Sequence, residues 1–214
     1  MILYDYPRAP NPMRLRIFMY EKKIKIKSIT VDLRNKDHLD KKNLKLNPWG
    51  TYPFLKINKK VINESIAICR YLEAKHPLPN LFGKSAMELG EIEMYRRKVE
   101  IDGLNSVGEA LRNSSNAFKD RAIAGPNKIK QIPELVKRGK NRTNLFFDFL
   151  EKHLKKNSYV AANRFTMADI DAYVTYSFAK WIKIDGSKKR NNIKLWVKKI
   201  EKRKSVQTYI NLFS

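Results

Sequence analysis

Residues 47–72 of the chain read NPWGTYPFLKINKKVINESIAICRYL, and this segment narrows the choice of fold. A loop containing Pro and Gly is followed by two short apolar runs, Phe54–Ile57 and Val61–Ile62, which flank a polar turn. This is the pattern of a β-hairpin. The next segment, Ser65–Lys75, spaces its apolar residues as an amphipathic helix does. The stretch therefore predicts a β-β-α unit entered through an irregular loop.

The residues before this unit continue an α/β pattern. Ile2–Tyr6 alternates like a strand, and Ile26–Val31 does so again. Between them lies a predicted helix, for which Asn11 is the expected N-cap and the following proline the first helical residue. A short helix is expected over Asp37–Leu46. Residues 1–76 thus order as β-α-β-α-β-β-α, an α/β domain with a mixed sheet.

Strand patterns stop after this domain. Residues 77–84 hold two prolines and a glycine and are predicted to be a linker, because neither a sheet nor a helix can run through them. Residues 85–214 are predicted to form an all-helical domain. Its expected helices are Ala86–Asn113, Pro133–Lys155, Met167–Trp181 and Ile193–Lys204.

One helix start in the second domain has a specific signature. Thr166 and Asp169 have the spacing of a capping box, in which each side chain binds the other's backbone N–H. Phe165 and Ile170 are placed to form the accompanying hydrophobic staple. This pattern predicts a well-defined, buried helix after Thr166.

Composition excludes several classes of protein. The chain has 214 residues and a single cysteine, Cys69, so a disulfide framework is impossible, and no apolar run is long enough to span a bilayer. The N-terminal strand does not resemble a signal peptide, so we expect a cytoplasmic protein without membrane association. His38, His76 and His153 are far apart in the sequence, and no structural metal is expected.

The net charge of +24, from 45 Lys+Arg and 21 Asp+Glu, is typical of proteins that bind nucleic acid or anionic membranes. The basic residues are, however, spread along the chain, and only Lys180–Lys204 is dense. This dense stretch lacks the interleaved aromatic residues of single-strand binders. Abundant Lys, Asn and Ile also arise from an A/T-rich coding sequence. Nucleic-acid binding is therefore expected to be non-specific, at low salt, if it occurs.

Two motifs narrow the fold to a family. The loop has the form Asn-Pro-x-Gly-x-Tyr52-Pro53-x-Leu, and Glu64-Ser65-x-Ala-Ile follows nine residues after that leucine. Together with the linker and the capping box, these residues resemble cytosolic glutathione transferases over essentially the whole chain. Segments around residues 9–18, 110–113 and 131–135 are similar to a bacterial and yeast-like subgroup without a clear catalytic Tyr, Ser or Cys. The resemblance implies a thioredoxin-like, glutathione-binding domain over residues 1–76.

The resemblance also implies how glutathione would bind. A cis peptide bond between Tyr52 and Pro53 would turn the backbone of Tyr52 outward, where a peptide can pair with it like an added strand. Ser65 begins a helix whose free N–H groups can hold the γ-glutamyl carboxylate, and Glu64 can accept from the ammonium group. Simple N-capping by Ser65 is the alternative. Cations near the second helix are expected to hold the glycine carboxylate. His38 occupies a position that similar families use near the backbone of glutathione, and the alternative is an exposed surface histidine. Lys41 and Lys42 are weaker candidates.

Activation of the thiol is the open question. To become mostly thiolate at neutral pH, a thiol must lower its pKa by about two units, or ~2.7 kcal/mol. The positive end of the first helix contributes, and Asn11 can donate an amide N–H to the sulfur. Tyr6 is where a tyrosine-type enzyme carries its phenol, and a water at residues 112–114 is a third possibility. Arg112 either favours the thiolate or pairs with a nearby acid.

A pocket for the second substrate is expected between the domains, with walls from Tyr6, Met13, Arg112 and Phe118. Cys69 lies on an apolar helix face and is predicted to be a buried small hydrophobe. The predicted function is a glutathione transferase that adds the thiolate to a small electrophile. Glutathione is a co-substrate and no other cofactor is expected; accessory peroxidase activity stays open.

The resemblance also implies that the enzyme forms a homodimer and takes part in detoxification. The alternative is a non-catalytic member of the same fold, which uses its helical surface and Lys180–Lys204 to bind a protein or nucleic-acid partner. The missing Ser, Cys or clear Tyr keeps this alternative open.

Overall fold

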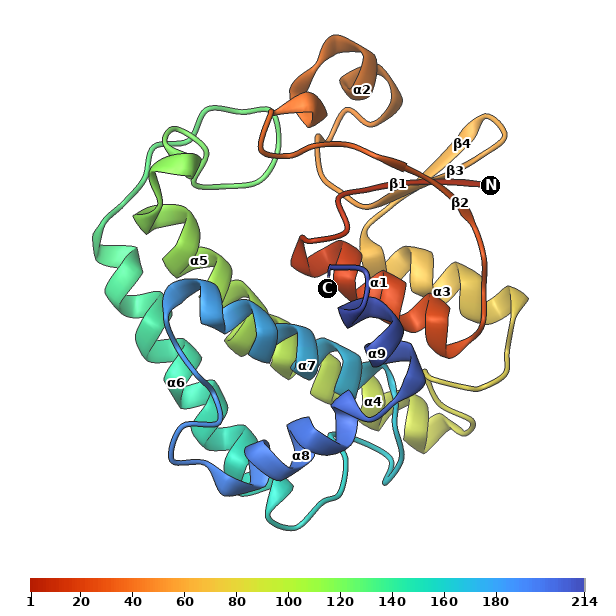
Figure 1. Cartoon of the computed structure of the whole chain (residues 1–214), viewed down its shortest axis with the longest axis vertical. Coiled ribbons are helices and arrows are strands. Elements are labelled where there is room, and N and C mark those ends of the chain that lie inside the picture. The colour runs from red at the N-terminus through yellow and green to blue at the C-terminus, as the bar shows by residue number, and fades with distance from the viewer. Residues whose placement is uncertain (214) are drawn as a thin grey trace.

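The computed structural model describes residues 1–213, which fold as an α/β domain followed by a helical domain (Figure 1). The first domain has the elements β1 (Ile2–Asp5), α1 (Pro10–Glu21), β2 (Lys27–Thr30), η1 (Asp37–Leu39), α2 (Lys41–Leu46), β3 (Phe54–Ile57), β4 (Lys60–Asn63) and α3 (Ser65–Lys75). This confirms the predicted order, in which η1 and α2 together take the place of the single short helix. Figure 1 shows α1 and α3 on the side of the sheet that faces the helical domain.

The sheet is mixed, as predicted, with the strand order β2-β1-β3-β4. β1 pairs with β2 in parallel and with β3 antiparallel, and β3 and β4 form the hairpin. Leu3 faces Leu55 across the central pair, and both are buried against the helices. On the opposite face, Tyr4 stacks on Phe54 in a smaller cluster that includes Tyr52. Because successive side chains of a strand point to opposite faces, apolar residues cover both faces of the sheet.

The start of α1 differs from the prediction. The helix begins at Pro10, and its N-cap is Ala9 in an extended conformation, so Asn11 lies inside the first turn and is not the cap. The physical reason is that Pro10 supplies the fixed φ and the absent N–H that suit the first helical position. A second proline, Pro12, then follows in the same turn.

All named elements in the described part of the second domain are helices. They are α4 (Ala86–Lys98), η2 (Val99–Leu104), α5 (Asn105–Ser114), η3 (Asn116–Phe118), α6 (Glu134–Leu154), α7 (Met167–Ala179), η4 (Lys180–Ile182), α8 (Asn191–Glu201) and α9 (Lys204–Ile210). An isolated bridge joins Arg121 and Ile129 in the loop between η3 and α6. The long helix expected over Ala86–Asn113 is interrupted by η2, a π-helical turn. Gly103 lies in this turn, where an added Cβ would meet the Thr175 and Phe146 side chains at 2.9 and 3.0 Å. Side chains of α6 and α7 thus pack closely against the backbone of this irregular turn.

The C-terminal helices also differ from the prediction. The single helix expected over Ile193–Lys204 is instead α8, which ends at Glu201, and α9 follows as a separate short helix. α9 packs beside α1 (Figure 1), where the Tyr209 hydroxyl donates to the Pro7 carbonyl oxygen at 2.8 Å and the Ser205 hydroxyl to the Glu21 carboxylate at 2.6 Å. A helix of this length depends on such tertiary contacts, because isolated short helices are marginal.

The capping box at the start of α7 is confirmed. The Thr166 backbone N–H donates to the Asp169 carboxylate at 3.0 Å, and the Val160 N–H and Trp196 Nε1 donate to its other oxygen at 3.0 and 3.1 Å. Both members of the predicted staple, Phe165 and Ile170, are buried. Across residues 1–213, every helix is too short or too polar to span a bilayer.

Candidate functional site

The loop before β3 presents an unpaired backbone. The Tyr52–Pro53 peptide bond is cis, as the motif predicts. Within residues 1–213, neither the N–H nor the C=O of Tyr52 has a hydrogen-bond partner. Its ring is buried beside Phe54, with 5.3 Å between ring centroids, and its burial raises the pKa of the phenol to about 12. The free N–H and C=O can pair with an extended peptide.

The start of α3 offers a second set of free groups. Ile68 N–H donates to the Glu64 carbonyl oxygen at 3.0 Å, and the three preceding N–H groups of the first turn have no partner in the described chain. The Ser65 hydroxyl does not cap the helix, whose N-cap residue is Glu64, so the capping alternative is not observed. Glu64 is exposed and has a φ of 65°, a strained backbone for a non-glycine residue. These free donors suit an anion.

His38 lies in η1 and is buried, so the prediction's alternative of an exposed surface histidine is wrong. Its ring centroid is 6.3 Å from that of Tyr52, and its Nδ1 has no hydrogen-bond partner. Burial, followed by the positive charges of Arg121 and Arg112, lowers the pKa of His38. A neutral imidazole therefore forms the wall beside Tyr52. Lys41 and Lys42 are exposed at the start of α2.

Among the first three residues of α1, Asn11 is the one that retains a backbone N–H, because Pro10 and Pro12 have none. This N–H has no partner in residues 1–213. The Asn11 side chain accepts a 2.8 Å hydrogen bond at Oδ1 from Nη2 of Arg14, which leaves its amide N–H₂ free to donate. Although the residue is not the N-cap, the predicted donor is present at the helix start.

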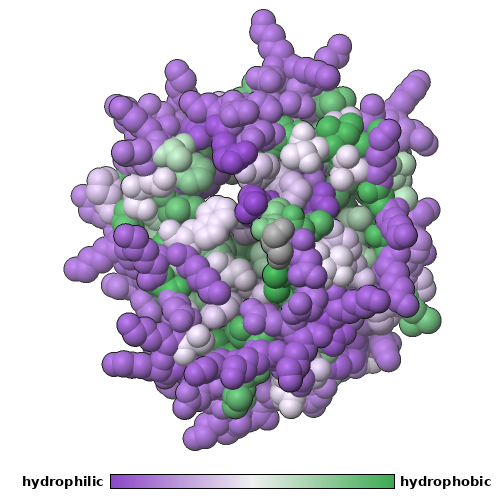
Figure 2. Space-filling view, in the orientation of Figure 1, coloured by the Kyte–Doolittle hydropathy of each residue, from purple (hydrophilic) through white to green (hydrophobic). Residues whose placement is uncertain are grey.

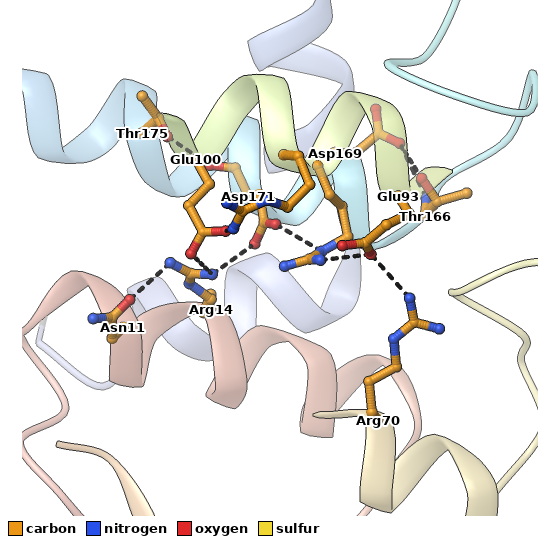
Figure 3. Close-up of polar contacts among 11 residues, drawn as sticks. Asn11, Arg14, Arg70, Glu93, Glu100, Thr166, Asp169, Asp171 and Thr175 are labelled. Atoms are coloured by element: carbon orange, nitrogen blue, oxygen red, sulfur yellow. Dashed lines mark hydrogen bonds and ion pairs between the residues drawn. The ribbon is translucent and has the colours of Figure 1, made fainter. Parts of the chain in front are cut away.

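A buried ion network supports Arg14 from the helical domain (Figure 3). Its Nη1 lies 3.6 Å from Oδ1 of Asp171 in α7, and the other oxygen of Asp171 lies 3.0 Å from Nε of Arg96 in α4. Arg96 in turn pairs with Glu93 at 2.8 Å. The side chains of Arg14, Asp171 and Arg96 are each only 2% exposed, so this link between the two domains is sealed from water.

Tyr6 and Met13, the other predicted wall residues from the first domain, are placed differently. Tyr6 follows β1 and is half-buried, with the Arg34 guanidinium carbon 5.8 Å from its ring centroid. Met13 is 7% exposed and belongs to the core of the α1 packing, which leaves little of it to line a pocket. The choice between Tyr6 and Asn11 stays a prediction.

The opposite wall comes from the end of α5 and the loop after it. The guanidinium carbon of Arg112 lies 4.7 Å from the Phe118 ring centroid, and that of Arg121 lies 5.7 Å from it. Nη1 of Arg112 donates to the Arg121 carbonyl oxygen at 2.6 Å. Within residues 1–213, neither arginine contacts a carboxylate, so the alternative in which Arg112 pairs with an acid is not observed.

The loop that carries Arg121 reaches the first domain (Figure 1). A Cβ at Gly50 would lie 3.4 Å from Cδ of Pro126, and one at Gly125 would lie 3.2 Å from the Trp49 carbonyl oxygen. Figure 2 shows a hollow near the middle of the molecule, beside the start of α1. The loop after η3 thus contacts the loop before β3, and we call the space between these loops and the start of α1 the interdomain site.

Other predicted features lie away from this site or take no part in it. Cys69 is fully buried in α3, and burial raises the pKa of its thiol, which fits a structural role. Among residues 1–213, no three His, Cys, Asp or Glu side chains are grouped so that they could hold a metal ion.

Sequence reasoning missed Arg14, Asp171 and Arg121. Arg14 follows Asn11 by three positions, so the two share a helix face, which is a usable signal. Asp171, like Asp169, is a charge in a largely apolar helix and could have been recognised as a buried, paired group. Arg121 lies in an irregular loop, and the sequence gives no signal for its position.

Known proteins resemble the chain in both domains. The family model "Glutathione S-transferase, N-terminal domain" matches residues 3–80, and "Glutathione S-transferase, C-terminal domain" matches residues 125–212. The chain is 28% identical to glutathione S-transferase 2 of Saccharomyces cerevisiae over 218 residues, which cover 100% of this chain and 91% of the yeast protein. It is 30% identical to glutathione S-transferase 3 of Zea mays over 175 residues, 78% of this chain and 72% of the maize protein.

Solved structures match over both domains. The crystal structure of Gtt2 from Saccharomyces cerevisiae has a TM-score of 0.89 at 27% identity and covers 98% of this chain and 100% of that one. A glutathione S-transferase domain-containing protein from Marinobacter aquaeolei VT8 has a TM-score of 0.87 at 28% identity, with 96% and 100% covered. The resemblance to a bacterial and yeast-like group, predicted from the motifs, is confirmed.

Proposed function

Because the chain belongs to the glutathione S-transferase family, we propose that it is itself a glutathione transferase that joins the thiol of glutathione to a small electrophile. One observation carries this proposal: the free backbone of Tyr52 and the free first turn of α3 lie on the same domain, as an extended γ-glutamyl peptide requires. The α-carboxylate would bind the N–H groups and hydroxyl at Ser65. Glu64 would accept from the ammonium group, and the cysteine residue would pair with Tyr52.

Thiol activation is proposed to come from Asn11. Its backbone N–H and side-chain amide are both free to donate, and the positive end of the α1 dipole adds to them. Hydrogen bonds to the charged form lower a pKa, so two donors and a dipole favour the thiolate. The thiolate sulfur then attacks the electrophilic carbon, and the leaving group departs with its bonding electrons. Tyr6 is the rival donor.

Glutathione binding is tested by calorimetry, and turnover by conjugation of 1-chloro-2,4-dinitrobenzene. Glu64→Gln replaces the carboxylate that is proposed to accept from the ammonium group with a neutral amide, and should weaken glutathione binding at least tenfold. Glu134→Gln is the matched control, since Glu134 also stands at a helix start and is exposed. A wild-type protein that neither binds glutathione nor turns over the probe would contradict the proposal. Cumene hydroperoxide in the same assay tests the accessory peroxidase activity.

We also infer a homodimer, through the outward face of α4. Met87 and Met94 are 80% and 57% exposed, and they line a shallow apolar hollow of about 510 Å³ together with Ala86, Gly90 and Glu91. Such a contiguous apolar face favours burial against a second copy. Met94→Asp should reduce the molecular mass measured by light scattering from that of a dimer to that of a single chain. Leu195→Asp, which changes an equally exposed residue of α8, should leave the dimer intact.

A non-catalytic binding protein is the second candidate, because the dense basic stretch gathers around a surface hollow. The hollow, of about 470 Å³, is lined by cations and acids that include Lys183, Lys188, Lys189, Arg190, Asp148 and Asp185. Retention of the protein on immobilised nucleic acid would favour this function if one nucleic-acid sequence releases it better than other polyanions do. The single buried thiol fits a cytoplasmic, reducing location for either function.

A further inference from the structure

Two neighbouring arginines of the interdomain site stand apart from the other arginines of the protein. Within residues 1–213, every arginine except Arg8, Arg112 and Arg121 lies within 4.0 Å of a carboxylate oxygen. Arg8 is placed differently, with its guanidinium carbon 4.4 Å from the centroid of the Phe213 ring. Arg112 and Arg121 are adjacent to each other, and burial, followed by the charge of Arg121, lowers the pKa of Arg112. Two partly buried like charges without an acid are unfavourable unless an anion joins them.

The hydrogen bonds of the pair leave most donors free. Arg112 uses Nη1 on the Arg121 carbonyl oxygen, and Arg121 uses Nη2 on the Ala117 carbonyl oxygen. A guanidinium has five N–H donors, so both forks keep donors for a further acceptor. The Phe118 ring lies beside both guanidiniums, and Gln131 Nε2 donates to the Arg112 carbonyl oxygen at 2.6 Å. The two cations are thus held in place without being neutralised.

The pair faces the proposed glutathione site from the other domain. Both positive charges act on His38, which lies next to Tyr52. The loop that carries Arg121 also touches the first domain, where Pro126 approaches Gly50. An anion bound by the pair would therefore lie across the cleft from the backbone of Tyr52, on the side from which an electrophile reaches the sulfur.

Glutathione itself does not need this pair. Its α-carboxylate is assigned to the free first turn at Ser65, and its glycine end would run toward α2, which has exposed Lys41, Lys42 and Lys45 on the same domain. The arginines belong to the opposite wall, where the second substrate is expected. Arg–carboxylate pairs with two parallel hydrogen bonds are the strong form of such recognition.

We propose that the electrophile is an anion, an aromatic or conjugated carboxylate whose carboxyl group is held by Arg112 and Arg121. This inference rests on the proposed transferase function and specifies its substrate class. In the reaction of a chlorinated nitrobenzoate, a sulfur–carbon bond forms and the carbon–chlorine bond breaks. Chloride leaves with the bonding electrons, and the thiol proton goes to solvent.

The test compares two acceptors that differ only in charge, 4-chloro-3,5-dinitrobenzoate and its carboxamide. For each, kcat/KM is divided by the uncatalysed rate constant with glutathione, which corrects for intrinsic reactivity. The wild type should prefer the carboxylate roughly tenfold or more. Arg121→Gln should reduce this preference about tenfold. Lys198→Gln, which removes one positive charge from an exposed residue of α8, should not change it. Equal preference in the wild type, or an equal loss in both variants, overturns the proposal.

Equilibrium binding separates this inference from the transferase function. Calorimetry measures glutathione and its two preformed S-aryl conjugates, carboxylate and carboxamide, with no turnover required. The carboxylate conjugate should bind roughly tenfold more tightly, and Arg121→Gln should remove the difference. Equal affinity overturns the proposal even for an active enzyme, whereas discrimination without turnover contradicts only the transferase function. If Arg121→Gln weakens glutathione alone by the same factor, the pair binds the glycine carboxylate, and the proposal is wrong.

Discussion

Arg14 donates a 2.8 Å hydrogen bond from Nη2 to Oδ1 of Asn11, and so fixes the Asn11 amide with its N–H₂ group free. Arg14 is itself held by Asp171 in the helical domain, so the orientation of a side chain in the first domain depends on the second (Figure 3). A donor that is already oriented stabilises a developing anion without reorganisation.

Asn11→Ala is expected to raise the pKa of the bound glutathione thiol by about one unit, ~1.4 kcal/mol, because one donor to the sulfur is lost. The rate at pH 6.5 should fall about tenfold or more. Ultraviolet titration of the enzyme–glutathione complex measures the thiolate directly. Asn191→Ala, at the exposed start of α8, is the control. If Tyr6→Phe raises the thiol pKa and Asn11→Ala does not, Tyr6 is the activating residue.

Arg14→Lys is expected to act through Asn11. Lysine lacks the planar fork that contacts Asn11 and Asp171 together, so the thiol pKa should rise in the variant. In a protein that already carries Asn11→Ala, the same change should give no further rise. Disturbing the buried pair also destabilises the fold, by up to ~3–5 kcal/mol if the charge of Asp171 loses its partner. Additive shifts in the thiol pKa would show that Arg14 acts independently of Asn11.

Asp169→Asn tests the capping box of α7. The carboxylate accepts from the backbone of Val160 and Thr166 and from Trp196, and an amide would turn its own N–H₂ toward some of these donors. The variant should lose about 3 kcal/mol of unfolding free energy, measured by urea denaturation. Asp148→Asn, at a half-exposed carboxylate on α6, should lose much less. Equal losses would mean that burial of the box is unimportant.

His38 provides a pH-dependent test of the interdomain geometry. Burial and the charges of Arg121 and Arg112 hold its pKa below the usual value of about 6.5. The stability that it contributes is therefore present above pH 6.5 and is lost as the pH falls through the lowered pKa. Removing one charge with Arg121→Gln should raise the His38 pKa, read from its ring proton by NMR. An unchanged titration would place Arg121 away from the site.

Replacing two glycines of the helical domain with alanine should change the stability of the fold in opposite directions. A Cβ at Gly139 would lie 2.7 and 2.8 Å from the backbone of Ser106 and Ala110, which cannot move aside. Gly139→Ala should therefore destabilise the fold by about 1–3 kcal/mol. Gly108 has open space around it, and Gly108→Ala should stabilise the fold by about 0.4–1 kcal/mol. Thermal unfolding distinguishes the two, and the same sign for both would contradict the packing of α5 against α6.

The sequence predicted most of the first domain because its signals are local. The hairpin after Pro53, the helix that begins at Ser65 and the capping box at Thr166 are set by neighbouring residues. Local signals failed where packing decides the outcome, as at the π-helical turn around Gly103 and in the separate helix α9. The cap of α1 was misplaced because Ala9 carries no capping side chain to indicate it.

The family, the order of strands and helices, and the helix start at Ser65 could be predicted from the residues alone, because backbone propensity and motif spacing act over a few residues. The contact of Arg14 with Asp171, and the effect of the Arg112 and Arg121 charges on His38, are seen only in the folded protein. These contacts join residues that are distant in sequence, and their distances depend on how the two domains pack. Charge pairing follows distance in space, which no local pattern specifies.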